Sequence, residues 1–194
     1  MPVRAWCPIC VKTRRRANYH KQLYDKRPVV QIDYCFLTEK TKPSPDDDPE
    51  KVLIPVLTAV DVTTGLTMAA VVPKKGANNY ALAELRRFVL EAGRSRGVLQ
   101  TDQEPAIKVL ARQAALQLSM TTRLAPKYSS SSSGAVERWH RERWGHAETL
   151  KEAIKLHYDV TVTSYSSLMT WIIKHGSWLY NRYQLHPDGK TSYE

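Results

Sequence analysis

The sequence predicts an α/β fold, a mixed five-stranded sheet flanked by helices, and three observations support this prediction. Stretches rich in β-branched and aromatic residues come first and are joined by turn residues. Amphipathic stretches with apolar residues at helical spacing then alternate with short strands. Two long helical stretches close the chain. Three consecutive strands favour an antiparallel meander, and the alternation that follows favours a sheet covered by helices.

The three meander strands are expected over 28–37, 51–61 and 66–73. The first, PVVQIDYCFL, has the β-branched and aromatic content of a buried strand. Pro55 in the second strand cannot donate a backbone hydrogen bond, so we expect an edge position or a bulge there. The segment 41–50 between these strands holds three prolines and four acids, which predicts a loop.

Helices and strands alternate in the second half of the chain. NNYALAELRRFVLEAG has an asparagine start, a glycine stop and an apolar face, and EPAIKVLARQAALQL carries a proline in its first turn, where helices tolerate one. The expected elements are, in order, helix 78–93, strand 97–102, helix 104–118, strand 119–126, a long helix over about 134–157 and a last helical segment over 164–184.

The positive charge of the chain is concentrated at its N-terminus. The 194 residues carry 29 Lys and Arg against 19 Asp and Glu, a net charge of +10, and residues 1–28 hold eight basic residues against one acid. A basic segment of this kind favours a polyanionic partner such as nucleic acid, although a solvated basic tail is the alternative. We therefore divide the chain into a basic segment, 1–28, and one domain, 29–194. No apolar run approaches the roughly 20 residues of a membrane span, so we expect no membrane contact.

The cysteines indicate a reducing compartment rather than a disulfide framework. There are three of them, an odd number, and no secretory signal precedes the basic segment, so we expect a soluble intracellular protein. Cys7 and Cys10 have the two-residue gap of half a zinc site. A full site needs two more ligands, and we expect zinc binding only if these are supplied upstream. Cys35 suits the core.

Three acids are placed where separate elements can bring them together. Asp33 lies mid-strand, Asp102 ends the fourth strand, and Glu137 lies in the first turn of the long helix. Three carboxylates at one sheet edge would hold Mg²⁺ or Mn²⁺, and two such ions can activate an attacking oxygen and stabilise a leaving one. Taken singly, Asp102 could instead cap a helix, Glu137 could favour a helix start, and Asp33 could pair with an arginine.

Several stretches resemble the catalytic core of retroviral and retrotransposon integrases, most closely the Ty1/copia type. VVQIDY, VLQTDQEPA and YSSSSSGAVER are similar to the stretches that carry the DDE acids of this family, and 34 residues separate Asp102 from Glu137, near the family's spacing. The ending YNRYQLHPDGKTSYE resembles the copia-type close, and CPICVKTRRR resembles the end of the family's His-His-Cys-Cys zinc module. The resemblance implies an RNase H-like fold for 29–194 and the remnant of a zinc-binding module in 1–28.

The resemblance also implies roles for individual residues. Asp33, Asp102 and Glu137 would be the catalytic, metal-binding acids, and the serine run 129–133 would be a mobile active-site loop. Arg141 lies one helical turn beyond Glu137 and could clamp a phosphate beside the metals. Further expected nucleic-acid contacts are Arg138, Lys127, Arg14, Arg15 and Arg16. We expect Trp139 and Trp144 to pack in the core rather than to stack on bases.

These residues lead to one preferred function and two alternatives. The preferred function is that of a Mg²⁺- or Mn²⁺-dependent DNA integrase that inserts retrotransposon DNA into target DNA by end-processing and strand transfer, as a homo-oligomer, in the nucleus after a cytoplasmic stage. Because the family's proline, glutamine and asparagine in the loop are serines here, a catalytically impaired, nucleic-acid-binding remnant is the first alternative. A stand-alone RNase H-like nuclease is the second.

Overall fold

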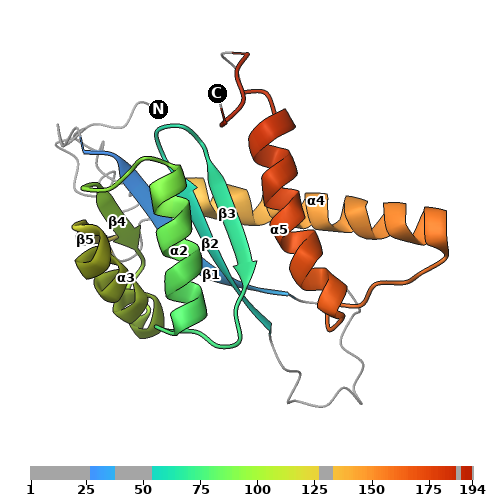
Figure 1. The fold of residues 1–194 in the computed structure, drawn as a ribbon, viewed down its shortest axis with the longest axis horizontal. Helices are drawn as coiled ribbons and strands as arrows, with labels where there is room; N and C mark the ends of the chain where they lie inside the picture. The colour runs from blue at the N-terminus through green and yellow to red at the C-terminus, as the bar shows by residue number, and fades with distance from the viewer. Residues whose placement is uncertain (1–26, 38–53, 127–132, 187–188, 194) are drawn as a thin grey trace, which may run out of the picture.

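The structure is a computed structural model that describes residues 27–37, 54–126, 133–186 and 189–193. Its strands form one five-stranded sheet in the order β3-β2-β1-β4-β5, with helices against it (Figure 1). This confirms the predicted fold class and the predicted order of elements. The elements are β1 Val29–Leu37, β2 Ile54–Asp61, β3 Thr67–Val71, α2 Asn79–Glu91, β4 Val98–Thr101, α3 Pro105–Leu118, β5 Thr121–Leu124, α4 Gly134–Tyr158 and α5 Ser167–Tyr183.

The sheet is mixed, as the sequence predicts. β1, β2 and β3 form an antiparallel meander, whereas β4 pairs in parallel with β1, and β5 in parallel with β4. The β1–β4 ladder runs from the pair Val29 and Val98 to the pair Gln31 and Gln100. Because these strands are parallel, the C-terminal ends of β1 and β4 lie at the same end of the sheet.

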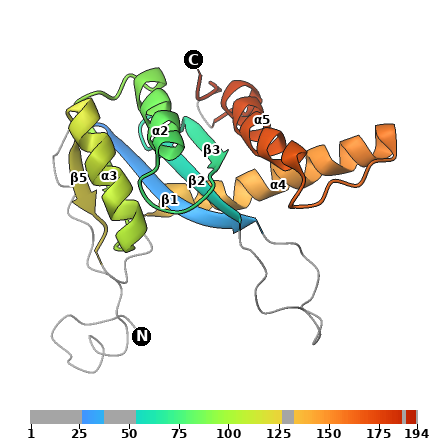
Figure 2. The ribbon, with the colours of Figure 1, turned by 60° about the horizontal axis from the view of Figure 1, so that its bottom comes forward.

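Alternate residues of β1 divide between two cores. Val30, Ile32 and Tyr34 pack in the core formed with α2 and α3. Leu37 and Cys35, of the other parity, pack in the core formed with α4 and α5. Figure 2 shows the same division, with α2 and α3 on one side of the sheet and α4 behind it, extending beyond its edge. Asp33 shares the parity of Cys35 and therefore belongs to the α4 side of the sheet.

The prediction for Pro55 was wrong. β2 lies between β1 and β3, so Pro55 is on an interior strand, and its register opposite Phe36 is continuous with that of its neighbours. The carbonyl of Pro55 accepts the N–H of Val72, 3.0 Å away, just beyond the last β2–β3 pair. The missing N–H of the proline therefore falls at the end of a ladder, where the loss of one donor costs little.

On the outer edge of β3, a side chain of α5 forms hydrogen bonds with the backbone of one strand residue. The amide oxygen of Asn181 accepts the backbone N–H of Thr67 at 2.9 Å, and its amide nitrogen donates to the carbonyl of the same residue at 2.8 Å. Both residues are buried. Within the described residues, no helix has the length and apolar character that crossing a membrane requires.

Candidate active site

Asp33 and Asp102 lie toward the same end of the two neighbouring strands β1 and β4, at a position called here the acidic edge. The parallel ladder pairs Gln31 of β1 with Gln100 of β4, and continuing this register by two residues places Asp33 opposite Asp102. Both side chains are partly exposed, in contrast to Gln31 and Gln100, which are buried. Strand pairing alone therefore brings two of the three predicted acids together at an accessible position.

The carboxyl group of Asp33 carries the electrostatic signature of this pairing. Its pKa is raised to about 6, first because burial disfavours the charged form and also because the negative charges of Asp102 and Glu104 are close. The backbone N–H of Tyr34, which donates to Asp33 Oδ1 at 2.7 Å, and the ammonium of Lys75 oppose the rise. A cation bound between these carboxylates would relieve the repulsion.

Glu104 and Lys75 belong to this cluster, although the sequence analysis missed them. The N–H of Glu104 donates to Asp102 Oδ1 at 3.0 Å, which fixes the orientation of that carboxylate. Lys75 Nζ contacts Glu104 Oε1 at 2.7 Å and lies 4.5 Å from the ring centroid of Phe36. The position of Glu104, two residues after Asp102, could have indicated it, but Lys75 comes from a loop with no sequence signal.

Glu137 does not join the two aspartates in this structure. It lies in the first turn of α4, and its side chain is exposed. Its helix is nevertheless attached to the acidic strand, because the N–H of Val136 donates to Gln31 Oε1 at 3.2 Å. Among the described residues, no three His, Cys, Asp or Glu side chains are grouped closely enough to hold a metal ion. The residues that precede this helix start, 127–132, lie outside the described part of the chain.

A second link joins α4 to the backbone of Asp33 through Thr58 and His140. Thr58 Oγ1 donates to the carbonyl of Asp33 at 2.9 Å and lies 2.7 Å from His140 Nε2. Since the hydroxyl proton goes to the carbonyl, His140 Nε2 is the donor to Thr58. The pKa of His140 is lowered to about 4 by burial and by the nearby charge of Arg143, so the ring is neutral at pH 7. This link was not foreseen, since a lone histidine on a helix gives no sign of its partner.

Arg143 is a charged residue on the buried side of α4. It is 3 % exposed, and its Nε and Nη1 atoms have no hydrogen-bond partner in the described structure. Its charge acts on Cys35, whose pKa burial raises and Arg143 lowers in part. Cys35 packs against the α4–α5 core, as expected for it.

The other predicted contact residues lie in several places. Arg138 and Arg141 are exposed on α4. Arg138 lines a hollow that also includes Tyr180 and His186 but neither Asp33 nor Asp102. Trp139 is buried, and its Nε1 donates to the carbonyl of Met68 at 3.1 Å, in agreement with a packing role. The predicted residues that lie outside the described part of the chain are Cys7, Cys10, Arg14, Arg15, Arg16 and Lys127.

The arrangement of this sheet is found in solved structures of viral integrases. The chain superposes on a chain of the simian T-cell lymphotropic virus intasome in complex with the PP2A regulatory subunit B56 gamma, with a TM-score of 0.61 and 19% identity over 86% of its length. It superposes on the BIV integrase catalytic core domain with a TM-score of 0.54 and 17% identity, covering 85% of this chain and 90% of that one. The chain has the RNase H-like fold of an integrase catalytic core.

A third similar structure is the HTLV-2 integrase catalytic core domain in complex with magnesium, in a trimeric form. The TM-score is 0.55 and the identity 16%, over 86% of this chain and 94% of that one. The chain covers only 53% of the simian viral chain, about half of its length. No protein-family model and no curated protein matches the sequence.

Proposed function

We propose that this chain is the integrase catalytic core of a Ty1/copia-type LTR retrotransposon, a polynucleotidyl transferase that inserts element DNA into target DNA. The observation that carries the proposal is the placement of Asp33 opposite Asp102 at the sheet edge of an integrase-core fold. The copia-type ending supports the choice of element type. The division into a basic segment, 1–28, and a catalytic core, 29–194, belongs to the same proposal.

The donor set at this edge fits a hard divalent cation. Asp33 and Asp102 offer carboxylate oxygens, the ligands that Mg²⁺ and Mn²⁺ prefer, and burial together with the charge of Asp102 raises the pKa of Asp33. Glu137, on the helix attached at Gln31, would supply the third carboxylate. When bound, paired ions would activate the attacking oxygen and stabilise the leaving oxygen of a phosphodiester. The magnesium named for the HTLV-2 core supports this choice of ion.

The residues of the chain itself orient the reacting groups. The N–H of Tyr34 holds one oxygen of Asp33, and the N–H of Glu104 holds one oxygen of Asp102. Each carboxylate therefore keeps a fixed orientation and turns its remaining lone pairs toward the site. Arg141, one helical turn after Glu137, would contact the phosphate beside this edge.

The remaining parts of the proposal concern partners and place of action. Element DNA and target DNA are the proposed partners, with Arg138, Lys127 and the basic segment as further contacts. Dimeric and trimeric forms of the HTLV-2 core support a homo-oligomer. Action in the nucleus after a cytoplasmic stage follows from the proposed reaction. Zinc binding by Cys7 and Cys10 remains conditional on two ligands from upstream.

A strand-transfer assay tests the proposal. The full chain is incubated with a short labelled duplex, a target plasmid and either Mg²⁺ or Mn²⁺, and joined products are counted. Asp102→Asn removes one charge at nearly constant shape, so we expect joining to fall by orders of magnitude while the folded chain persists. Asp159→Asn, at the exposed end of α4, is the matched control and keeps full activity.

The exposed position of Glu137 favours one second candidate, a catalytically impaired remnant that only binds nucleic acid. A wild-type chain that binds DNA as tightly as the Asp102→Asn variant, yet joins none with either metal, would support the remnant and overturn the enzyme. Cleavage of the duplex without joining would instead support the RNase H-like nuclease.

A further inference from the structure

On the α4 side of the sheet, the described helices pack mainly on β1, β2 and β3. Of the described helices, α4 packs on β1 and β2 and α5 packs on β3. β5 is the edge strand next to β4, and its residue Thr121, which shares the α4 side of the sheet with Arg123, is exposed. A polar side chain on this face is therefore accessible to a partner molecule.

Arg123 is held on this face in a fixed orientation. β5 pairs Arg123 with Gln100, and Gln100 pairs with Gln31, so the three side chains form a row on the α4 side of the sheet. Gln100 Oε1 accepts from Arg123 Nε at 3.1 Å and also from Nη2. A neutral amide thus holds the guanidinium without compensating its charge, and the two N–H groups of Nη1 point away from that amide.

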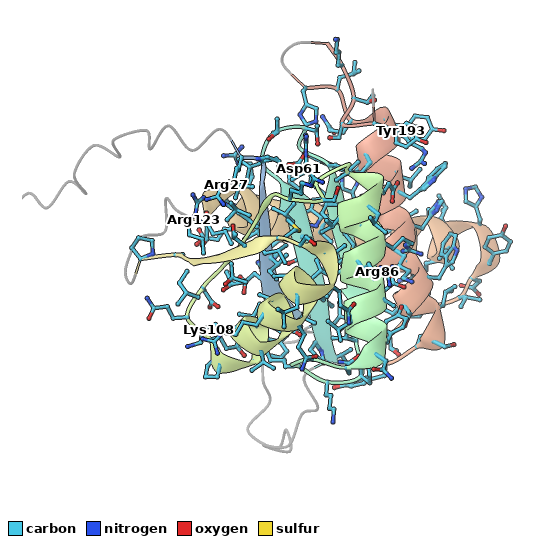
Figure 3. All side chains as sticks on the ribbon, turned by 60° about the vertical axis from the view of Figure 1, so that its left-hand side comes forward. Arg27, Asp61, Arg86, Lys108, Arg123 and Tyr193 are labelled. Atoms are coloured by element: carbon cyan, nitrogen blue, oxygen red, sulfur yellow. The ribbon has the colours of Figure 1, made fainter. Side chains whose placement is uncertain are left out.

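Arg27 places a second anchored guanidinium on the same face, two residues back along β5 from Arg123. It is exposed, and its Nη1 donates to Thr121 Oγ1 at 3.1 Å. Thr121 and Arg123 are two residues apart on β5, so they share a face and are separated by about 7 Å. Figure 3 shows Arg27 and Arg123 next to each other, away from Arg86 on α2.

We propose that Arg27 and Arg123 bind neighbouring phosphates of a DNA strand and lead that strand to the acidic edge. Arg123 pairs with Gln100, two residues before Asp102, and Thr121, the partner of Arg27, pairs with Val98, four residues before it. The line from Arg27 to Arg123 therefore runs toward the proposed catalytic carboxylates. Planar guanidinium groups donate in pairs to phosphate oxygens, and their fixed orientation lowers the entropic cost of binding. The inference deepens the proposed function, on which it rests, by adding Arg123 of β5 as a DNA contact and by giving Arg27, of the basic segment 1–28, a defined position beside it.

Salt-dependent binding tests this surface. The full chain, in metal-free buffer, is titrated at several KCl concentrations against a mixed-sequence duplex of about 25 bp, which spans more than two helical turns. Each lost phosphate contact lowers the slope of log K against log salt by about 0.9. We expect this change for Arg123→Gln and for Arg27→Gln, about twice the change for the double variant, and none for the exposed control Arg86→Gln.

A conservative variant separates charge from orientation. Arg123→Lys keeps the charge but loses the paired contact with Gln100, so we expect the salt slope of the wild type with an affinity about threefold lower. If Arg123→Gln proves unfolded by circular dichroism, the slope of Arg27→Gln and the affinity of Arg123→Lys carry the test. Slopes of Arg27→Gln and Arg123→Gln equal to those of the wild type and of Arg86→Gln would overturn the surface, and so would a wild type that does not bind the duplex.

The binding result is independent of the strand-transfer result. A chain that joins no DNA but shows the expected slopes would keep this surface and lose the proposed enzyme. A chain that joins DNA with unchanged slopes would keep the enzyme and lose the surface.

Discussion

At the scale of the residue, Asp33 places a carboxyl group where the fold disfavours its charge. Burial and the neighbouring charges of Asp102 and Glu104 raise its pKa to about 6, whereas an unfolded chain would ionise it near pH 4. The protonated form is therefore favoured by folding. Stability from this group is fully present below pH 4 and is lost as the pH rises through 6.

This sign gives the first prediction, which concerns Asp33→Asn. Asparagine cannot ionise, so we expect the variant to be more stable than the wild type at pH 7, by about 1 to 3 kcal/mol after solvent screening. At pH 3.5 the two should be equally stable. Urea unfolding at both pH values measures the difference. A difference that is the same at pH 3.5 and pH 7, or that Asp159→Asn reproduces, would contradict the prediction.

At the scale of the element, α4 is fastened to the meander by two polar links on either side of Glu137. The N–H of Val136 bonds to Gln31, and His140 reaches the carbonyl of Asp33 through Thr58. The first link precedes Glu137 by one residue and the second follows it by three. The two links therefore set the start of the helix relative to the strand that carries Asp33.

The second prediction tests the link through Thr58. Thr58→Val keeps the shape of the side chain but leaves His140 Nε2–H without its acceptor, so we expect a loss of about 1 to 3 kcal/mol of stability. Thr149→Val, on the exposed side of α4, should cost less than about 0.5 kcal/mol. Urea unfolding measures both values.

A companion variant distinguishes the hydrogen bond from general packing. His140→Gln places an amide donor at a similar reach, so we expect it to keep more stability than His140→Leu. If His140→Leu is as stable as His140→Gln, the hydrogen bond to Thr58 contributes nothing and the link fails.

At the scale of the whole molecule, the sequence was sufficient for the arrangement of elements and only partly for the site. Period-two and helical patterns and their end signals, such as Asn78 capping α2, depend on neighbouring residues and are therefore readable. The positions of Asp33 and Asp102 on separate strands indicated that they could meet, and the parallel pairing of β1 with β4, a tertiary property, brings them close together. The prediction of an edge position or a bulge at Pro55 failed because the cost of a missing N–H depends on whether that group faces a paired strand. This is a tertiary property that the local sequence does not show.

Other features of the site depend on contacts between distant segments. Lys75 contacts Glu104, and His140 contacts Thr58, only after the sheet and α4 have assembled. No local sequence pattern therefore predicts these two contacts. The same holds for Arg143, a charged residue on the buried side of α4. Sequence patterns indicated the three acids but not the groups that orient them.

The third prediction concerns the outer edge of β3. Asn181→Leu removes both hydrogen bonds to the backbone of Thr67, so we expect a loss of about 1 to 3 kcal/mol and increased self-association through the exposed strand. Light scattering during incubation at moderate urea measures the association. Asn79→Leu, at an exposed position of α2, should behave as the wild type, and equal scattering from both variants would refute the role of Asn181.

The closure of β3 by Asn181 also has a consequence for the timing of folding. During synthesis the meander, complete at Val71, emerges more than one hundred residues before Asn181. Through that interval a nascent chain can assemble its hairpins but cannot cover their outermost strand, and neighbouring chains on the same messenger could pair with it. A ribosome-associated chaperone that shields this strand until the last helix appears would therefore raise the yield of native protein more than one that acts after release.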